Sequence, residues 1–465
     1  MSENENRKTI LHTEKKRSTF SGRLGYVLAV AGSAVGLGNI WRFPYLAAKY
    51  GGGIFLLTYL VLMLTFGYAL IVSETALGRM TKRSPVGAFR AFGKKLPFKF
   101  GGWINAVIPM LIVPYYSVIG GWVIKYLFEY LRGNTKFLAQ DDYFAGFISD
   151  GYSAEFWFLL FSVIVVVILF AGVKHGVERV SKVMMPLLVL LAVFVAGYSM
   201  TRPGALEGVK YFLIPNFGNF SWMTVVAAMG QMFYSLSIAM GILYTYGSYM
   251  KKDVDIEQST TQVEIFDTAI AMLAGLMIIP AVFAFSGGDP DTLQAGPSLM
   301  FITIPKVFAS MGFGTGAGIM FFLLVLLAAL TSAISLAESG VSTFEDQLGL
   351  SRHKATALMG IIMVLFGSAS ALGFGVLDFV SVLEMSILDF FDFLTNSLMM
   401  PVAALATCLL VTHVAGLDKI IQEVEQSSGF KRKRMYCFFM KYLAPVCIVI
   451  ILLSSIANVF GWITM

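Results

Sequence analysis

Apolar stretches about 20 residues long recur along almost the whole chain, and each is long enough to cross a membrane as a helix. Hydrophobic residues make up 57% of the 465 residues and charged residues 13%, against about 45–50% and about 25% in soluble domains. This composition excludes a soluble enzyme and favours one polytopic, all-α membrane domain over several globular ones. Eleven membrane helices are predicted, at residues 22–48, 53–79, 101–130, 154–172, 178–199, 221–250, 260–285, 316–346, 354–374, 378–411 and 436–462.

The basic residues predict how these helices are oriented. If the polar segment 1–21 lies in the cytoplasm, 26 of the 34 Lys and Arg residues fall on the cytoplasmic side, which is the bias typical of membrane proteins. Eleven spans then place the C-terminus outside, in a multi-pass protein of the plasma membrane. We interpret the basic run at 431–434 as a topology anchor rather than a specific site for anionic lipids. The net charge of +6 requires no nucleic-acid partner.

Motifs of other function classes are missing or out of context. The cysteines, Cys408, Cys437 and Cys447, form no CxxC pair that could hold a metal, and no GxxxxGK[ST] motif indicates a nucleotide-driven pump. The glycine-rich sequence at 312–318 follows no predicted strand, so we interpret it as a connector and not as a dinucleotide site. The loop at 286–315 is too polar to span, and we predict that it folds over the outer face as a lid.

The first predicted span has an unusual centre, because Gly32, Gly36 and Gly38 crowd a hydrophobic helix. Each glycine costs about 1 kcal/mol relative to alanine in a helix interior. Close helix packing through the GxxxG pair is one explanation. A break in the helix is the other, and polar neighbours favour it because such residues are costly in lipid unless they face a partner or water. These neighbours are Ser33, Asn39 and Arg42.

The sixth span shows the same anomaly, five spans later. Its polar residues are Gln231, Tyr234, Ser235 and Ser237. Paired breaks in corresponding helices indicate an inverted repeat with a binding site at its interface. We therefore predict a single transmembrane domain at 22–462, with one repeat at 22–199, a second at 221–411 and an extra helix at 436–462. Unwound turns offer N–H groups to a carboxylate and carbonyls to a cation, so a zwitterion with Na⁺ would use both.

The eighth span contains Thr331 and Ser332 next to small residues. Their hydroxyls could bond back to the preceding helical turn, or they could be hard oxygen ligands for a small cation. Asp267 lies deep in the seventh span, where an uncompensated carboxylate is costly, and it favours a nearby cation.

The chain resembles the neurotransmitter:sodium symporter family, in particular its bacterial members of the LeuT type. The resemblance covers nearly the whole chain and is carried by residues 23–53, 73–79, 114–116, 230–237 and 330–348. It implies the LeuT-like fold, with a five-plus-five inverted repeat and broken helices one and six. It also implies Na⁺-coupled import of amino acids by alternating access, with two Na⁺ ions as cofactors. The sequence leaves the oligomeric state open, since many relatives have a twelfth helix.

The resemblance also implies roles for individual residues. The first sodium site would consist of Ala34, Asn39, Ser235 and Asp267, and the second of Gly32, Val35, Ala328, Thr331 and Ser332. The substrate carboxylate and ammonium would meet Leu37, Gly38, Tyr116, Ala34, Tyr234 and Ser235. The substrate side chain would meet Ile112, Tyr116, Tyr234, Ser237, Met240, Ser332 and Leu336.

Gates are implied on both sides of this site. The outer gate would pair Arg42 with Asp389, or with Asp392 as a rival, near Gln231 and beneath Tyr234. The inner gate would pair Arg17 with Asp346, backed by Tyr249. Gly176 and Pro186 match a family pattern in the fifth span that would let this segment unwind. Phe20 stands where an inner-gate tryptophan is common.

Three positions predict selectivity. Gly36 replaces the aspartate of amine-transporting relatives, which predicts α-amino acid substrates. Met240 replaces a frequent phenylalanine, and its flexible thioether predicts a pocket for aromatic and branched aliphatic side chains. Ala271 replaces a serine that helps Tyr59, Gln231 and Ser235 to hold chloride in some relatives, and Asp267 adds a fixed negative charge. Transport is therefore expected to be chloride-independent.

Overall fold

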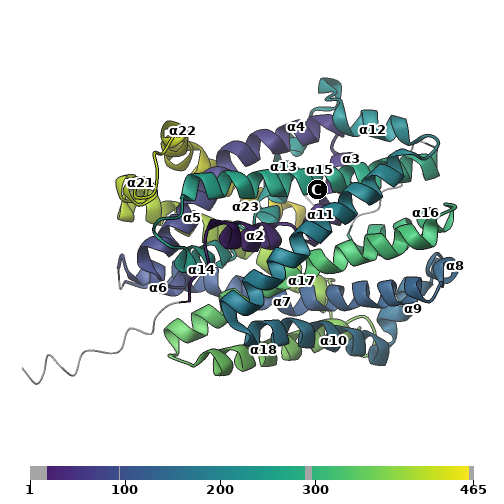
Figure 1. Ribbon diagram of the computed structural model, residues 1–465, viewed down its shortest axis with the longest axis horizontal. Helices are drawn as coiled ribbons and strands as arrows, with labels where there is room; N and C mark the ends of the chain where they lie inside the picture. The colour runs from purple at the N-terminus through teal and green to yellow at the C-terminus, as the bar shows by residue number, and fades with distance from the viewer. Residues whose placement is uncertain (1–17, 94, 288–295, 460–465) are drawn as a thin grey trace, which may run out of the picture.

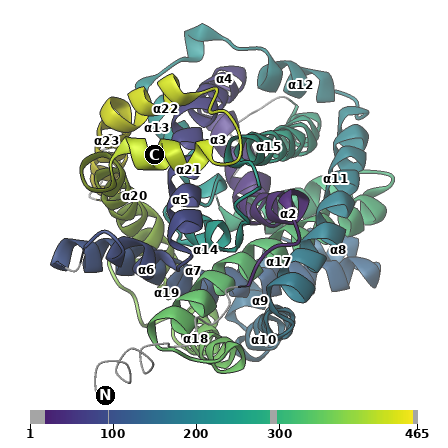
Figure 2. The same ribbon diagram turned by 60° about the vertical axis from the view of Figure 1, so that its left-hand side comes forward.

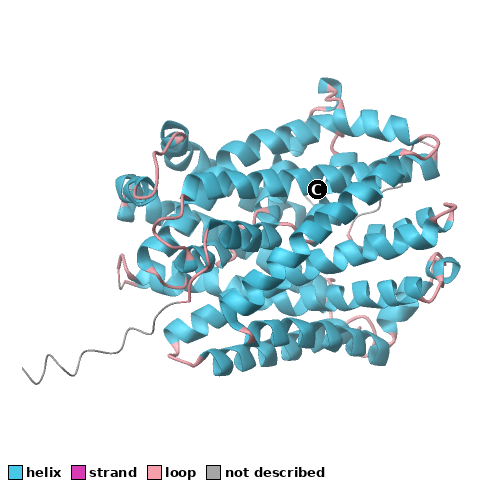
Figure 3. Ribbon diagram, in the orientation of Figure 1, coloured by secondary structure: helices cyan, strands magenta, loops and turns pink. Residues whose placement is uncertain are grey.

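The computed structural model describes residues 18–93, 95–287 and 296–459, and within these ranges every extended element is a helix (Figure 3). β-pairing there is limited to two isolated bridges, between Gly52 and Pro215 and between Val382 and Met385. Arg17, predicted for the inner gate, lies outside the described residues. The predicted all-α class is confirmed.

Nine helices in the described ranges are long and apolar enough to cross a membrane. Five of them are continuous α-helices: Leu96–Leu131 (α7), Gly151–Phe170 (α10), Ile256–Ser286 (α15), Gly314–Leu348 (α17, Gly314–Gln347) and Arg352–Leu372 (α18). The other four contain π-helical segments, labelled η. They are Gly53–Thr81 (α4, Gly53–Leu62; η2, Met63–Gly67; α5, Tyr68–Thr81), Val173–Met200 (η3, Val173–Glu178; α11, Arg179–Met200), Ile387–Ala415 (α19, Ile387–Asp392; η7, Phe393–Met399; α20, Met400–Leu409; η8, Leu410–Ala415) and Lys433–Ala457 (α22, Lys433–Phe438; η9, Phe439–Leu443; α23, Ala444–Val459).

Two further predicted spans are interrupted. The first consists of Arg23–Ala34 (α2) and Gly38–Lys49 (η1, Gly38–Arg42; α3, Phe43–Lys49), which meet at an angle of 54°. The sixth predicted span consists of Trp222–Ser235 (α13) and Ile242–Tyr249 (α14), separated by the non-helical residues 236–241. Both predicted breaks are present. Neither half of the sixth span is long enough to cross by itself, so the total of eleven stays a prediction.

The broken helices lie inside the bundle. Figures 1 and 2 place α2, α14 and α17 in its interior, with α10, α11, α18 and α23 around them. Burial agrees, because α14 is buried along its whole length, whereas apolar residues of α10 and α11 such as Val167 and Leu190 are more than half exposed. Such apolar exposure on outer helices is the pattern of a surface that faces lipid. Short helices connect the spans: α6 (Pro85–Arg90), α8 (Thr135–Leu138), α9 (Tyr143–Ser149), α12 (Ala205–Leu213), η4 (Phe217–Asn219) and α21 (Leu417–Glu425).

Two connections differ from the prediction or refine it. The tenth span was expected from residue 378, but its helix begins at Ile387, where the Ser386 hydroxyl accepts the Asp389 N–H as an N-cap. The preceding residues form turns, with Leu383 and Glu384 at positive φ. The loop at 286–315 contains η6 (Leu299–Thr303) and α16 (Ile304–Ala309), which together are too short to span.

The basic run at 431–434, predicted as a topology anchor, also contacts other helices through Arg432. The Arg432 guanidinium lies 3.6 Å from the centre of the Tyr68 ring and 3.1 Å from Glu264 Oε2. Its backbone N–H donates to Glu257 at 3.0 Å. Arg432 therefore fastens the start of the last span to α15 and α5, a role that its charge alone did not predict.

Candidate functional site

The three glycines of the first span make room for neighbours from other helices. A Cβ atom on Gly36 would lie 2.7 Å from Ser332 Oγ and 3.0 Å from the Tyr116 hydroxyl. One on Gly38 would lie 2.4 Å from the ring of Tyr234. Both explanations offered for these glycines therefore hold, because the helix is broken here and also packs closely.

Glu74, which the sequence analysis did not predict as a functional residue, holds the break in the sixth span. Ser237 and Ala239 have positive φ angles of 54° and 61°, which are strained for residues with side chains. The Ala239 N–H donates to the buried carboxylate of Glu74 at 3.0 Å, and the Ser237 and Ser33 hydroxyls are 2.9 Å apart. Glu74 was detectable as an acidic residue inside a predicted span.

One cluster of oxygen atoms surrounds Asp267. Its carboxylate accepts hydrogen bonds from Asn39 Nδ2 at 2.8 Å, Ser235 Oγ at 2.7 Å and the Tyr59 hydroxyl at 2.8 Å. All four side chains are buried, and they come from η1, α13, α4 and α15. The structure thus brings together residues that are up to 228 positions apart. Carboxylate, amide and hydroxyl oxygens are the donor set that hard cations prefer.

A second group of oxygen atoms lies where α17 meets the break in the first span. Ser332 Oγ is 3.3, 3.1 and 3.4 Å from the carbonyl oxygens of Gly32, Ser33 and Val35. The Thr331 hydroxyl donates back to Leu327 O at 3.0 Å and is 3.1 Å from Ala328 O. The predicted back-bonding is therefore present, and the lone pairs of the hydroxyl remain available to a cation.

A narrow cavity lies between the two groups. Its free volume is about 20 Å³, close to the minimum that holds one water. The Leu37 N–H donates to the Tyr116 hydroxyl at 3.1 Å beside it. Ten of the eleven predicted substrate residues line this cavity, and Ser235 is the exception. The ten are Ala34, Leu37, Gly38, Ile112, Tyr116, Tyr234, Ser237, Met240, Ser332 and Leu336. Four further residues complete the lining: Ser33, Gly36, Asn39 and Ile242.

A larger cavity of about 360 Å³ lies on the predicted outer side of Tyr234. Arg42, Asp389 and Asp392 all line it, and the Arg42 guanidinium is 5.4 Å from the centre of the Tyr234 ring. Within the described chain no ion pair joins Arg42 to either carboxylate. Asp389 instead accepts from the Ser386 hydroxyl at 2.7 Å, and Asp392 accepts from Tyr115 and Asn396. Gln231 donates to Gly38 O at 3.0 Å, which fixes it beside the broken turn.

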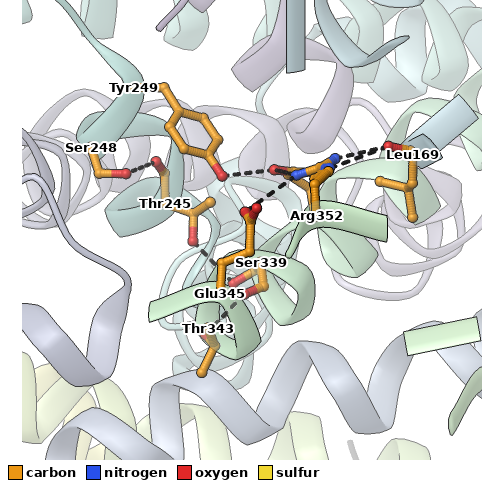
Figure 4. A network of polar contacts seen from close by, with 9 residues as sticks. Leu169, Thr245, Ser248, Tyr249, Ser339, Thr343, Glu345 and Arg352 are labelled. Carbon is orange, nitrogen blue, oxygen red and sulfur yellow. Dashed lines mark hydrogen bonds and ion pairs between the residues drawn. The ribbon is translucent and has the colours of Figure 1, made fainter. Parts of the chain in front are cut away.

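On the predicted inner side, a network of polar contacts is centred on the Glu338 carboxylate. Figure 4 shows Tyr249, Arg352 and Leu169 turned toward one another in this network. The Tyr249 hydroxyl donates to Glu338 Oε1 at 2.7 Å, and Arg352 forms a bidentate ion pair with the same carboxylate. Arg352 also donates to Leu169 O at 3.0 Å. The network joins α14, α17, α18 and α10. The predicted Tyr249 is part of it, while Glu338 and Arg352 were missed. Glu338 is an acidic residue inside the predicted eighth span, whereas Arg352 precedes the ninth span, which was predicted from residue 354 but begins at Arg352.

Asp346, the other predicted inner-gate residue, accepts a hydrogen bond from the Ser84 N–H. This contact places Asp346 at the end of α17, beside the start of α6. The predicted inner gate, a pair of Arg17 and Asp346, stays a prediction.

Comparison with known proteins agrees with this architecture. A model of the sodium:neurotransmitter symporter family matches residues 17–143 and 148–462. The sodium-dependent transporter YhdH of Bacillus subtilis is 34% identical over 449 residues, covering 96% of this chain and 99% of the relative. A sodium-dependent transporter of Haemophilus influenzae is 32% identical over 459 residues, covering 95% and 99%. The crystal structure of MhsT in complex with L-phenylalanine is 36% identical, covers 94% of this chain and 100% of that one, and superposes with a TM-score of 0.85. This chain therefore belongs to the sodium:neurotransmitter symporter family, a family of sodium-coupled membrane transporters and not of enzymes.

Proposed function

We propose that this chain is a Na⁺-coupled symporter that imports hydrophobic and aromatic L-amino acids by alternating access. It would lie in the plasma membrane with its N-terminus in the cytoplasm and its C-terminus outside. One observation carries the proposal: the two broken helices meet at a single cavity that lies between two groups of buried oxygen atoms. Backbone N–H groups of the broken turns suit a carboxylate, and the oxygen groups suit cations.

The substrate carboxylate would bind the amides of Leu37 and Gly38 and the Tyr116 hydroxyl. The hydrogen bond from the Leu37 N–H to the Tyr116 hydroxyl supports this, because it shows that the two groups lie side by side at the cavity. Residue 36 is glycine and supplies no carboxylate, and a Cβ there would lie 2.7 Å from Ser332 Oγ and 3.0 Å from the Tyr116 hydroxyl. The substrate must therefore supply its own carboxylate. Its ammonium would meet the carbonyls of Ala34, Tyr234 and Ser235.

The substrate side chain would lie against Ile112, Tyr234, Met240 and Leu336. Their apolar surfaces favour large apolar side chains, and a methionine adapts to their shape. The small free volume means that lining side chains move when such a substrate enters. MhsT, whose structure contains L-phenylalanine, supports the same substrate class.

Thermal stabilisation of the purified protein by each of the twenty amino acids, in Na⁺ or in K⁺, tests this proposal. We expect aromatic and branched aliphatic amino acids to raise the unfolding midpoint in Na⁺ only, because a ligand that binds the folded state stabilises it. Tryptamine should bind about tenfold more weakly than tryptophan, a difference of about 1.4 kcal/mol. Stabilisation by glycine or glutamate alone, or equal binding of tryptamine, would refute the proposed substrate class.

Two Na⁺ ions would accompany the substrate. The first would bind Ala34, Asn39, Ser235 and Asp267, together with the substrate carboxylate. The second would bind the carbonyls of Gly32, Val35 and Ala328 and the hydroxyls of Thr331 and Ser332. The short distances within each oxygen group support both assignments.

The double variant Thr331→Ala, Ser332→Ala tests the second ion. Removing two of its oxygen ligands should raise the Na⁺ concentration for half-maximal stabilisation about tenfold or more, a loss of about 1.4 kcal/mol. Thr343→Ala is the matched control, because Thr343 lies on the same helix and bonds back to Ser339 O at 2.9 Å. If the folded double variant needs the same Na⁺ concentration as the unmodified protein, the two hydroxyls are not Na⁺ ligands. If the double variant only loses stability, the hydroxyls have a purely structural role.

Transport would need no chloride. The Tyr59 and Ser235 hydroxyls, which would hold chloride in some relatives, donate here to the Asp267 carboxylate. Ala271 lies one turn further along α15 and adds no donor. The carboxylate would thus supply the negative charge that a bound anion supplies elsewhere.

A further inference from the structure

A fully buried arginine holds two connecting segments at the inner end of the second span. Arg79 lies in the last turn of α5, and its side chain is completely buried. Its Nε lies 2.7 Å from Glu423 Oε1, and its Nη2 donates to Glu423 O. Its Nη1 donates to Val254 O at 2.6 Å and to Ser427 Oγ at 3.3 Å. Arg79 therefore binds the loop between α14 and α15 and, at the same time, residues 417–427, which we call the α21 connector.

These contacts use the particular chemistry of arginine. A guanidinium carries five N–H donors in a rigid, planar fork, whereas a lysine carries one nitrogen at the end of a flexible chain. Only the fork can donate to a carboxylate and to carbonyls on two different segments from one buried position. The guanidinium thus fixes the loop at residue 254 and the α21 connector relative to each other.

The inner half of the sixth span packs very closely against the same end of α5. A Cβ on Gly78 would lie 2.1 Å from Tyr244 O, and one on Gly247 would lie 2.4 Å from Thr75 O. The backbones of α5 and α14 are therefore in direct contact in both directions. Close-packed interiors transmit displacement instead of absorbing it. A movement of α14 must then carry the end of α5 with it.

The chain beyond the α21 connector is held by the same helices. Glu257, in the first turn of α15, accepts the N–H groups of Lys431 at 2.7 Å and Arg432 at 3.0 Å. The Tyr436 hydroxyl, in α22, lies 2.9 Å from Ser73 Oγ in α5. Figures 1 and 2 both place α21 beside α5. The inner ends of the tenth and last spans are thus joined to α5 and α15.

The tenth and last spans also form part of the wall of the outer cavity. Asp392 and Ser397 of the tenth span line this cavity, and so do Ile451 and Ser454 of the last. Within the bundle, α20 packs against α23. The α21 connector therefore links, at the inner side, two spans that border the cavity on the outer side.

We infer that Arg79 is a positioning residue that makes the α21 connector follow the inner half of the sixth span. A movement of α14 then reaches the tenth and last spans through the connector and alters the outer cavity. Packed helices joined by buried polar contacts can carry such coupling across a protein. This inference rests on the alternating access of the proposed function, but it does not depend on which amino acid is carried.

Cysteine labelling at the outer cavity of the full-length purified protein tests the inference. The reporter is Ser397→Cys, at a partly exposed position of the cavity wall, in a background in which Cys408, Cys437 and Cys447 are alanine. A symporter that has bound Na⁺ must keep its outer side open for the substrate. A polar maleimide should therefore label this reporter about tenfold faster in Na⁺ than in K⁺, a typical size for coupling between two sites.

Two variants at the inner side should weaken this response. Arg79→Lys can still pair with Glu423 but cannot reach Val254 O as well, and Glu423→Gln keeps the shape of the partner without its charge. In each, the ratio of labelling rates should fall to about twofold or less, because substitutions in a coupling network change it by this order. The Na⁺ concentration for half-maximal thermal stabilisation should stay within about twofold of the unmodified value, because neither residue is a proposed Na⁺ ligand.

Arg83→Lys is the matched control, since Arg83 is an exposed arginine four residues further along the chain. It should keep the unmodified ratio. The inference is overturned if Arg79→Lys and Glu423→Gln also keep that ratio, whether or not their unfolding midpoints fall, because Arg79 would then only stabilise the fold. An equal loss of the ratio in Arg83→Lys overturns it too.

Failure of the proposed function would look different. If the reporter without further substitutions labels equally fast in Na⁺ and in K⁺, the outer cavity does not respond to Na⁺, and alternating access fails together with the inference. Failure of the proposed substrate class alone would appear only in the amino-acid stabilisation series, because this labelling uses no amino acid.

Discussion

Replacing Asp267 with asparagine should raise the Na⁺ concentration needed for half-maximal stabilisation about a hundredfold or more in chloride-free solution. Asparagine keeps the shape of the side chain but removes its charge. A pair of unit charges about 4 Å apart attract by about 4 kcal/mol at an effective dielectric constant of 20, and each 1.4 kcal/mol changes affinity about tenfold. The measurement is thermal unfolding of the purified variant in a series of sodium gluconate concentrations.

The same experiment tests chloride independence. The unmodified protein should show equal Na⁺ dependence in gluconate and in chloride, because Asp267 accepts the hydrogen bonds of Tyr59 and Ser235. The double variant Asp267→Asn, Ala271→Ser should regain Na⁺ affinity when chloride is added. A large loss of Na⁺ binding by the unmodified protein in gluconate would show that Asp267 does not replace the anion.

Replacing Arg352 with alanine should destabilise the protein by about 3–5 kcal/mol, the typical cost of removing one partner of a buried ion pair. Glu338 is fully buried, and without Arg352 its charge would keep only the Tyr249 hydroxyl among the contacts described for it. The measurement is the thermal unfolding midpoint. The double variant Glu338→Gln, Arg352→Ala should be more stable than Arg352→Ala alone, because the uncompensated charge is gone.

Lys354→Ala is the control for this prediction, since Lys354 is an exposed cation on the same helix α18. It should leave the unfolding midpoint almost unchanged. If Arg352→Ala proves as stable as Lys354→Ala, or if the double variant is the least stable of the three, the network does not stabilise the inner side of the protein.

The broken helices could be predicted from the sequence because their causes are local. Glycines and polar residues in the middle of an apolar stretch conflict with a continuous membrane helix, and both breaks lie where this conflict occurs. Six of the ten predicted substrate residues that line the cavity lie in the broken turns or directly beside them, for the same reason. The resemblance to a known family supplied the residues from other helices, such as Ile112 and Leu336.

The polar contacts between elements could not be predicted, because they depend on how helices pack. Glu338 with Arg352, and Glu423 with Arg79, are each formed by residues on different elements. The start of the tenth span was predicted too early for another reason. Phe379 and Leu383 are apolar and resemble a membrane segment, but they are exposed residues of a turn that precedes the Ser386 cap. Hydropathy alone does not distinguish an apolar turn from the start of a membrane helix.

Uptake of radiolabelled L-phenylalanine into proteoliposomes tests Na⁺-coupled amino-acid transport most directly. With Na⁺ outside and K⁺ inside, we expect the labelled amino acid to accumulate above its external concentration. An ionophore that collapses the Na⁺ gradient should abolish this accumulation, and gluconate in place of chloride should not affect it. Equal uptake with K⁺ on both sides, or none of any amino acid under a Na⁺ gradient, would contradict the proposed function.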